Sequence, residues 1–104
     1  MSDLLTAFTT EGYQFALYAW DKAPTGDYGV ISIEDGDDLM ADGHHIERGT
    51  NLLVDYFTRD ATDTIRTSLE AILDEEDTAW NLRSVQFESD TGYIHYEWSV
   101  GIYG

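Results

Sequence analysis

Metal binding is the first chemistry that the residue types of this chain suggest, because its 104 residues include 21 acidic residues and three histidines but no cysteine. His44 and His45 are adjacent, and Glu47 follows them closely. If these residues lie on a strand, adjacent side chains point to opposite faces, so only His45 and Glu47 share a side. Because two ligands are fewer than a zinc site takes, no metal and no other cofactor are expected. A metal-dependent hydrolase that uses His45, Glu47 and nearby acids remains an alternative hypothesis.

The segment Glu34–Gly43 is a second place to look for a cation, because it concentrates carboxylates and glycines. An EF-hand loop needs oxygen ligands at positions 1, 3 and 5, Gly at position 6 and Glu at position 12. A loop starting at Asp35 has Met40 at position 6, and a loop starting at Asp38 has Gly49 at position 12. The segment is therefore predicted to be a solvated loop of about ten residues rather than a calcium site.

Asp55 and His95 are the remaining candidates for acid–base chemistry. Asp55 interrupts an apolar run, and the favoured interpretation is an exposed residue or a charge partner for a neighbouring Arg. His95 is expected on the solvent side of the last strand. The chain contains no G-x-S-x-G, Walker, H-E-x-x-H or G-x-G-x-x-G motif. No catalytic residue is assigned, and the protein is expected not to be an enzyme.

The formal net charge of -16 excludes several partners. DNA and RNA are bound by basic stripes that release counterions, and the five scattered cations of this chain provide none. Direct binding to nucleic acid or to an anionic membrane is therefore not expected. The chain has no basic targeting segment and no apolar run near the roughly 18 residues that span a bilayer. We expect a soluble protein made in the cytoplasm.

Two acidic clusters form the candidate interaction surface. One lies in the loop described above, and the other lies at the end of an expected helix, where the helix dipole favours cations instead. The acids could meet a basic partner, imitate DNA, or only keep the chain soluble. The candidate interaction residues are Glu34, Asp35, Asp37, Asp38, Asp42, Asp74, Glu75, Glu76 and Asp77.

The hydrophobic patterns predict an α+β fold in a single domain of residues 1–104. We expect a mainly antiparallel sheet of about four to five strands, one long amphipathic helix packed across it, and a short N-terminal helix. Asp60 is the expected cap of the long helix. The expected elements are helix Asp3–Phe8, strands Tyr13–Trp20, Tyr28–Ile33 and Ile46–Thr58, helix Ala61–Asp74, and strands Trp80–Glu88 and Tyr93–Tyr103.

Alternation along the strands predicts which side chains face the long helix. The helix should present one apolar stripe to the sheet, made of Ile65, Leu69, Ile72 and Leu73. The middle strand should place Leu52, Val54 and Tyr56 on one face and Leu53, Asp55 and Phe57 on the other. The last strand should place Ile94, Tyr96, Trp98, Val100 and Ile102 under the helix and His95, Glu97, Ser99 and Gly101 on the opposite face.

Several runs of the chain resemble the small tail-terminator or tail-completion proteins of long-tailed bacteriophages. Their common features are a strand with an aromatic-Thr-Arg step, a single amphipathic helix, and a closing strand with Tyr, Glu and Trp. The runs are Ala41-Asp-Gly43, Val54-Asp-Tyr-Phe-Thr-Arg-Asp60, the helix Ile65–Leu73, Trp80-Asn-Leu-Arg-Ser-Val-Gln-Phe-Glu88 and Thr91-Gly-Tyr-Ile-His-Tyr-Glu-Trp98, together with the Tyr13–Gly29 stretch.

The resemblance implies a structural protein of the virion tail that is assembled in the host cytoplasm. Proteins of this type form a ring, usually of six copies, which caps the head-proximal end of the tail tube. The implied partners are the tail-tube protein and the head–tail connector. The strong negative charge departs from what the resemblance implies, and it motivates an alternative function as an acidic DNA-mimic inhibitor of a nucleic-acid-binding enzyme.

Overall fold

The prediction of an α+β fold is confirmed by the computed structural model, which describes residues 2–22, 24–33, 50–60, 62 and 64–102. Within these residues, two helices accompany a five-stranded sheet, and one of the helices is the short N-terminal one. The elements are α1 (Ser2–Thr10), β1 (Phe15–Leu17), β2 (Tyr28–Ile33), β3 (Thr50–Thr58), α3 (Thr64–Glu75), β4 (Ala79–Glu88) and β5 (Tyr93–Ile102). The predicted acidic loop, with Glu34, Asp35, Asp37, Asp38 and Asp42, and the pair His45 and Glu47 lie outside the described residues.

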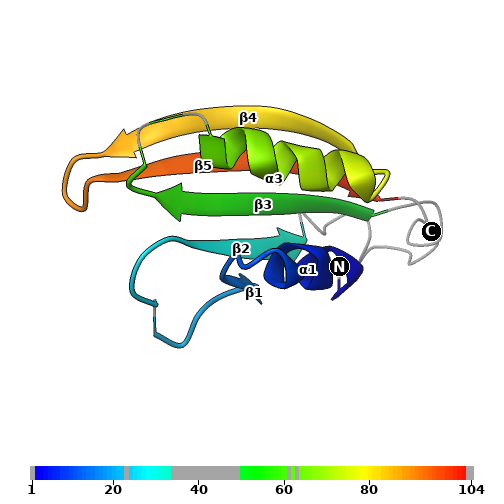
Figure 1. Cartoon of the computed structure of the whole chain (residues 1–104), viewed down its shortest axis with the longest axis horizontal. Helices are drawn as coiled ribbons and strands as arrows, with labels where there is room; N and C mark the ends of the chain where they lie inside the picture. Colours follow the sequence, from blue (N-terminus) through cyan, green and yellow to red (C-terminus); the bar gives the residue numbers. More distant parts are fainter. Residues whose placement is uncertain (1, 23, 34–49, 61, 63, 103–104) are drawn as a thin grey trace, which may run out of the picture.

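The sheet is mixed, with the strand order β1-β2-β3-β5-β4 (Figure 1). β1 pairs with β2 in parallel, and the other three pairings are antiparallel. β3 and β5 occupy the centre and pair along their whole length, from Thr50 opposite Ile102 to Thr58 opposite Ile94. β1 and β4 therefore form the two edges of the sheet.

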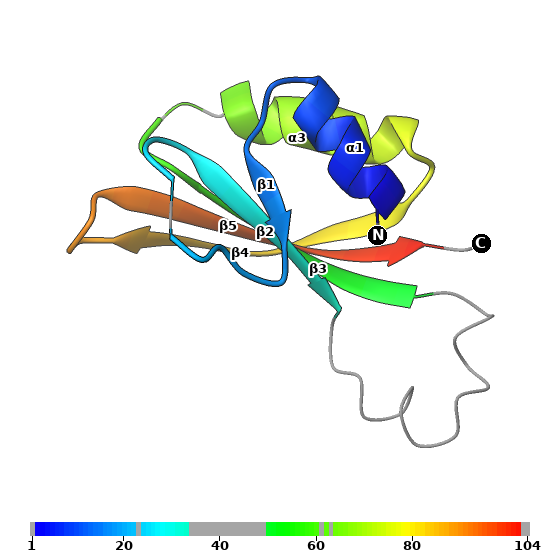
Figure 2. The same ribbon diagram turned by 90° about the horizontal axis from the view of Figure 1, so that it is seen from below.

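α1 and α3 cover the same face of the sheet, and within the described residues the other face carries no helix (Figures 1 and 2). The hydrophobic core lies between the helices and the covered face. It consists of Leu4, Phe8, Phe15, Ile31, Leu52, Val54, Tyr56, Leu69, Ile72, Leu73, Tyr96, Trp98 and Val100. Among the described residues, no helix has the length and apolar character that crossing a membrane would require.

The alternation predicted for β3 is confirmed, because Leu52, Val54 and Tyr56 are buried while the residues between them are partly exposed. The long helix is also held to the sheet by a polar contact. The indole Nε1 of Trp98 donates a hydrogen bond of 3.0 Å to Glu70 Oε2, which also accepts one of 3.1 Å from Arg66. A fully buried Trp thus satisfies its only polar atom on α3, which fixes the helix over β5.

The predicted start of the long helix is wrong. Asp60 was expected to cap it, but its carboxylate accepts hydrogen bonds from the backbone N–H of Thr62 at 2.9 Å and from the Thr62 hydroxyl at 2.8 Å. This is an Asx turn that precedes the helix, and α3 begins at Thr64. The same two hydrogen bonds, first the backbone one, lower the pKa of Asp60.

The acidic end of α3 has a local structural role. Asp77 adopts a left-handed backbone conformation with φ of 59°. Its N–H bonds to the carbonyl of Asp74 at 3.1 Å, and the N–H of Thr78 bonds to that of Leu73 at 3.3 Å. This is the Schellman pattern, in which Asp77 takes the position usually held by Gly. The run of acids therefore ends the helix as well as carrying charge.

The N-terminal part differs from the prediction in its bounds. α1 extends to Thr10, beyond the predicted Phe8, and the Thr9 hydroxyl bonds back to the carbonyl of Leu5 at 2.9 Å. β1 covers only Phe15–Leu17 of the predicted Tyr13–Trp20 strand, because Tyr18 takes a φ of 68°, which an extended strand does not use. One edge of the sheet is therefore very short.

Gly29 of β2 provides a test of the packing between α1 and the sheet. A Cβ at this position would overlap the ring of Phe15, which is stacked between Phe8 at 4.3 Å and Tyr56 at 5.4 Å between ring centroids. We expect Gly29→Ala to lower the free energy of unfolding by about 1–3 kcal/mol, because a tightly packed ring must move.

Gly101→Ala in β5 is the matched control, because its added methyl would meet other atoms only at 3.5 Å or beyond. Denaturant unfolding of both variants makes the comparison. Equal stability of the two variants would contradict the packing described for Phe15.

Candidate functional site

The candidate functional site is the sheet face opposite α1 and α3, which no other described helix covers and which we call the open face (Figure 2). The register places Phe57 of β3 opposite His95 of β5, and Asp55 opposite Glu97. β2 adds Tyr28 beside Phe57. Because strand residues alternate between faces, all five side chains lie on the side away from the core. The sheet thereby gathers aromatic and ionisable groups from three strands.

Aromatic rings form a row across the open face. Tyr28 stacks on Phe57 with 4.8 Å between ring centroids, and Phe57 stacks on His95 at 4.2 Å. Tyr93 meets Tyr28 edge-on at 5.7 Å. The Arg59 guanidinium lies over the Tyr93 ring at 4.2 Å, and its Nε donates to the carbonyl of Thr91 at 3.0 Å. The row therefore has an aromatic body and a cation at one end.

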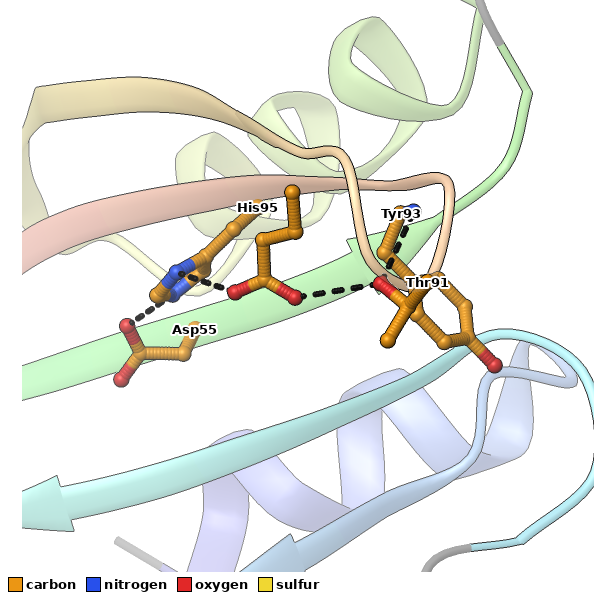
Figure 3. Close-up of polar contacts among 5 residues, drawn as sticks. Asp55, Thr91, Tyr93 and His95 are labelled. Atoms are coloured by element: carbon orange, nitrogen blue, oxygen red, sulfur yellow. Dashed lines mark hydrogen bonds and ion pairs between the residues drawn. The ribbon is translucent and has the colours of Figure 1, made fainter.

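His95 lies between two carboxylates. Its Nε2 is 2.8 Å from Asp55 Oδ1, and its Nδ1 is 3.9 Å from Glu88 Oε2. Glu88 also accepts a hydrogen bond of 3.4 Å from the Thr91 hydroxyl. Figure 3 shows this chain of contacts running from Asp55 through His95 to Thr91 and Tyr93 at the β4–β5 turn. The imidazole is thus oriented from both of its nitrogens and from the Phe57 ring below it.

The surroundings of His95 raise its pKa above the ordinary value of 6.5. The hydrogen bond that His95 donates to Asp55 is the largest cause. Burial acts against it, and the charges of Asp55, Glu88 and Glu97 add to the increase. The pKa of Glu97 is also raised, chiefly by burial and then by the nearby Asp55, while Arg83 and His95 act in the opposite direction. The cluster therefore favours retention of a proton in a locally negative setting.

This arrangement does not match a Ser-His-Asp triad. In a triad, one imidazole nitrogen faces a carboxylate and the other faces the nucleophilic hydroxyl. In this protein, the second nitrogen of His95 faces the carboxylate of Glu88 instead. The geometry suits holding a proton or a cation between carboxylates more than activating a nucleophile.

The residues singled out from the sequence are spread over the molecule. Asp55 was expected to be exposed or paired with an Arg, but it pairs with His95, and 17% of its side chain is exposed. The four acids at the end of α3, Asp74 to Asp77, are exposed. Asp74 accepts a hydrogen bond of 2.7 Å from Trp80 Nε1, so it also fastens the helix end to β4.

Sequence reasoning missed the cluster of Asp55, His95 and Glu97. Their ligand atoms all lie within 4.8 Å of one another. His95 and Glu97 were correctly placed on one face of their strand, but Asp55 is 40 residues from His95. For both strands, the sheet face of each residue was predicted correctly. A prediction that the two strands pair would therefore have shown that Asp55 lies close to His95 and Glu97.

Comparison with known proteins gives no relative: no protein-family model, no curated protein and no solved structure matches this chain.

The pKa of His95 tests the geometry of the open face. We expect Asp55→Asn to lower this pKa, because the substitution removes the hydrogen-bonded charge that raises it. Histidine NMR titration measures the change, and Asp21→Asn, at an exposed site, is the control. An unchanged pKa in Asp55→Asn would contradict the contact.

Folding raises the pKa of His95, so His95 stabilises the folded state fully at any pH below its pKa in the unfolded chain, near 6.5. This stabilisation is lost as the pH rises through the pKa of His95 in the folded protein. The difference in unfolding free energy between the wild type and His95→Gln should therefore shrink as pH rises through that window. A difference that grows with pH would show that the sign is wrong.

Proposed function

We propose that this protein is a structural subunit of a long-tailed bacteriophage, in which it forms a ring that ends the tail tube on the head-proximal side. Its partners in this proposal are further copies of itself, the tail-tube protein and the head–tail connector, within the virion tail. The family part of the proposal rests on the sequence resemblance described above. The proposal that copies form a ring rests on one structural observation, the exposed edge strand β4.

β4 is a long edge that displays apolar side chains. It has ten residues, and Val85 and Phe87 are exposed to 50% and 69%. Proteins normally protect sheet edges, because an exposed, apolar edge invites pairing with another chain. A bulge between Leu82 and Ser84 interrupts the first half of the strand, so we assign the contact to the regular half, Ser84–Glu88.

The two edges of the sheet are unlike, which suits head-to-tail association. Near the opposite edge, Tyr18 is exposed to 58% at the end of β1. A contact between unlike surfaces of neighbouring copies is heterologous, and it closes into a ring when the rotation between copies permits. We propose that the β4 edge of one copy contacts the surface around Tyr18 of the next copy.

The proposed role also depends on the finer fold that the hydrophobic patterns predict, a mainly antiparallel sheet with one long amphipathic helix across it. Three of the four strand pairings are antiparallel, and α3 buries Leu69, Ile72 and Leu73. The role is steric. One face of the ring fits the last tube ring, and the other lacks what a further tube subunit needs, so polymerisation stops without any chemical step.

Phe87→Lys tests the β4 edge. We expect it to prevent self-association while the monomer stays folded, because Phe87 lies outside the core and contributes to the interface. Asn81→Lys is the matched control, since it adds the same charge at an exposed position of the same strand, outside the segment Ser84–Glu88. Native mass spectrometry measures the association, and equal assembly of the two variants would contradict the interface.

Salt should strengthen assembly. Six copies carry a formal charge of -96, six times -16, so repulsion opposes the ring. The screening length falls from roughly 30 Å at 0.01 M salt to roughly 8 Å at 0.15 M. Light scattering across this range should therefore show growth from monomers toward rings.

The DNA-mimic alternative predicts the opposite trend for its own complex, because attraction to a basic enzyme weakens as salt rises. A protein that stays monomeric at every salt concentration, also beside the tail-tube protein, would contradict the ring.

A further inference from the structure

We propose that Asp55, His95 and Glu97 form a binding site for a divalent transition-metal cation, of which Zn²⁺ is the best-fitting example. The three residues come from the two central strands and lie side by side on the open face. Each offers one ligand atom, and these atoms lie within 4.8 Å of one another. The ligands lie on β3 and β5, whereas the edge proposed for assembly is β4. The two regions share Glu88, which supports His95 but is not a ligand. Metal binding by the monomer and assembly of copies are therefore measured separately.

The spacing of the ligand atoms fits such an ion. Zinc bonds to imidazole nitrogen and carboxylate oxygen are about 2.0–2.2 Å long, so tetrahedral ligand atoms lie roughly 3.3 Å apart. In this cluster His95 Nε2 and Asp55 Oδ1 lie 2.8 Å apart, and no two of the three ligand atoms are farther apart than 4.8 Å. Small side-chain rotations therefore bring all three atoms to bonding distance. The ion replaces the proton that His95 and Asp55 share, and that proton leaves to solvent.

The imidazole is already oriented as a metal ligand. Metal-binding histidines usually direct their second nitrogen at a carboxylate or a carbonyl, which fixes the ring. Nδ1 of His95 faces the Glu88 carboxylate at 3.9 Å, and the ring stacks on Phe57 at 4.2 Å. Nε2 is thereby directed at Asp55. Asp55, His95 and Glu97 are thus the direct ligands, and Glu88 and Phe57 support the position of His95.

The local charge also favours a cation. Three carboxylates, Asp55, Glu97 and Glu88, surround the imidazole and outnumber the cationic Arg83, whose charge acts on Glu97. Of the side chains, 17% of Asp55 and 21% of His95 are exposed. Carboxylates in such a partly buried place repel one another, and a divalent ion neutralises them. One nitrogen and two oxygens favour zinc or a related transition metal over calcium and magnesium, which take oxygen ligands alone.

The spacing of residues in the sequence predicts no bound metal, and the proposed site differs from this prediction. That expectation considered His45 and Glu47, which are close in the sequence. The open-face cluster joins residues from two strands instead, and His95 and Glu97 share a strand face at positions two apart.

Titration calorimetry with Zn²⁺, in an excess of Mg²⁺ to occupy unspecific carboxylates, tests the site. We expect one ion per chain in the wild type. Glu97→Gln should weaken binding by more than the 10- to 100-fold loss typical of an outer-shell partner, while Glu88→Gln should fall within that range. Glu97→Gln retains the hydrogen bond between Asp55 and His95, so the variant should stay folded. A thermal melt of the variant checks this, and weaker binding in a folded variant then reports the loss of a ligand.

Two controls separate this site from general attraction to acids. Glu75→Gln removes an equal charge from the exposed end of α3, and His45→Gln removes the histidine of the alternative site. Both should bind Zn²⁺ like the wild type. Histidine NMR should show that Zn²⁺ shifts the Nε2 resonance of His95.

Three results would overturn the proposal: no binding in the wild type, equal weakening in Glu75→Gln and Glu97→Gln, or loss of binding in His45→Gln with an unchanged His95 signal.

Discussion

The pairing of β3 with β5 is the contact on which the rest of the structure depends. Its register decides which side chains enter the core and which reach the open face. Tyr56 lies opposite Tyr96 on the buried side, and Asp55 lies opposite Glu97 on the other. A slip of one residue would exchange the two faces, placing carboxylates beneath the helix. The buried aromatic and aliphatic residues therefore fix the positions of the ionisable ones without touching them.

The second constraint on the structure is that α1 and α3 both pack on the same face of the sheet (Figure 2). α3 is held to that face by buried side chains and by the hydrogen bond between Trp98 and Glu70. With α1 and α3 both on this side (Figure 2), His95 and Asp55 on the opposite face stay partly exposed. Phe87 lies on the covered side of the sheet, but it belongs to the edge strand β4 and is exposed. The cluster proposed for a metal thus follows from this asymmetric layering, whereas the surface proposed for assembly follows from the edge position of β4.

Local patterns in the sequence predicted the elements well where a strand alternates and ends in a turn. The strand Tyr28–Ile33 has the predicted bounds, and the hairpin of β4 and β5 lies where it was expected. Prediction failed where a residue takes a special backbone conformation or a distant partner. The left-handed φ of Tyr18 shortens β1, and the contact of Asp55 with His95 spans 40 residues. Neither follows from local propensity, because both are set by tertiary packing.

The central claim is that copies of this chain associate through the outer edge of β4, and hydrogen exchange tests it most directly. The backbone amides of Ser84–Glu88 that do not bond to β5 should exchange quickly in the monomer and slowly after assembly, because a neighbouring copy then covers them. The amides of β5, already paired on both sides within the sheet, should change little. An assembled ring in which the β4 amides exchange as fast as in the monomer would contradict the account.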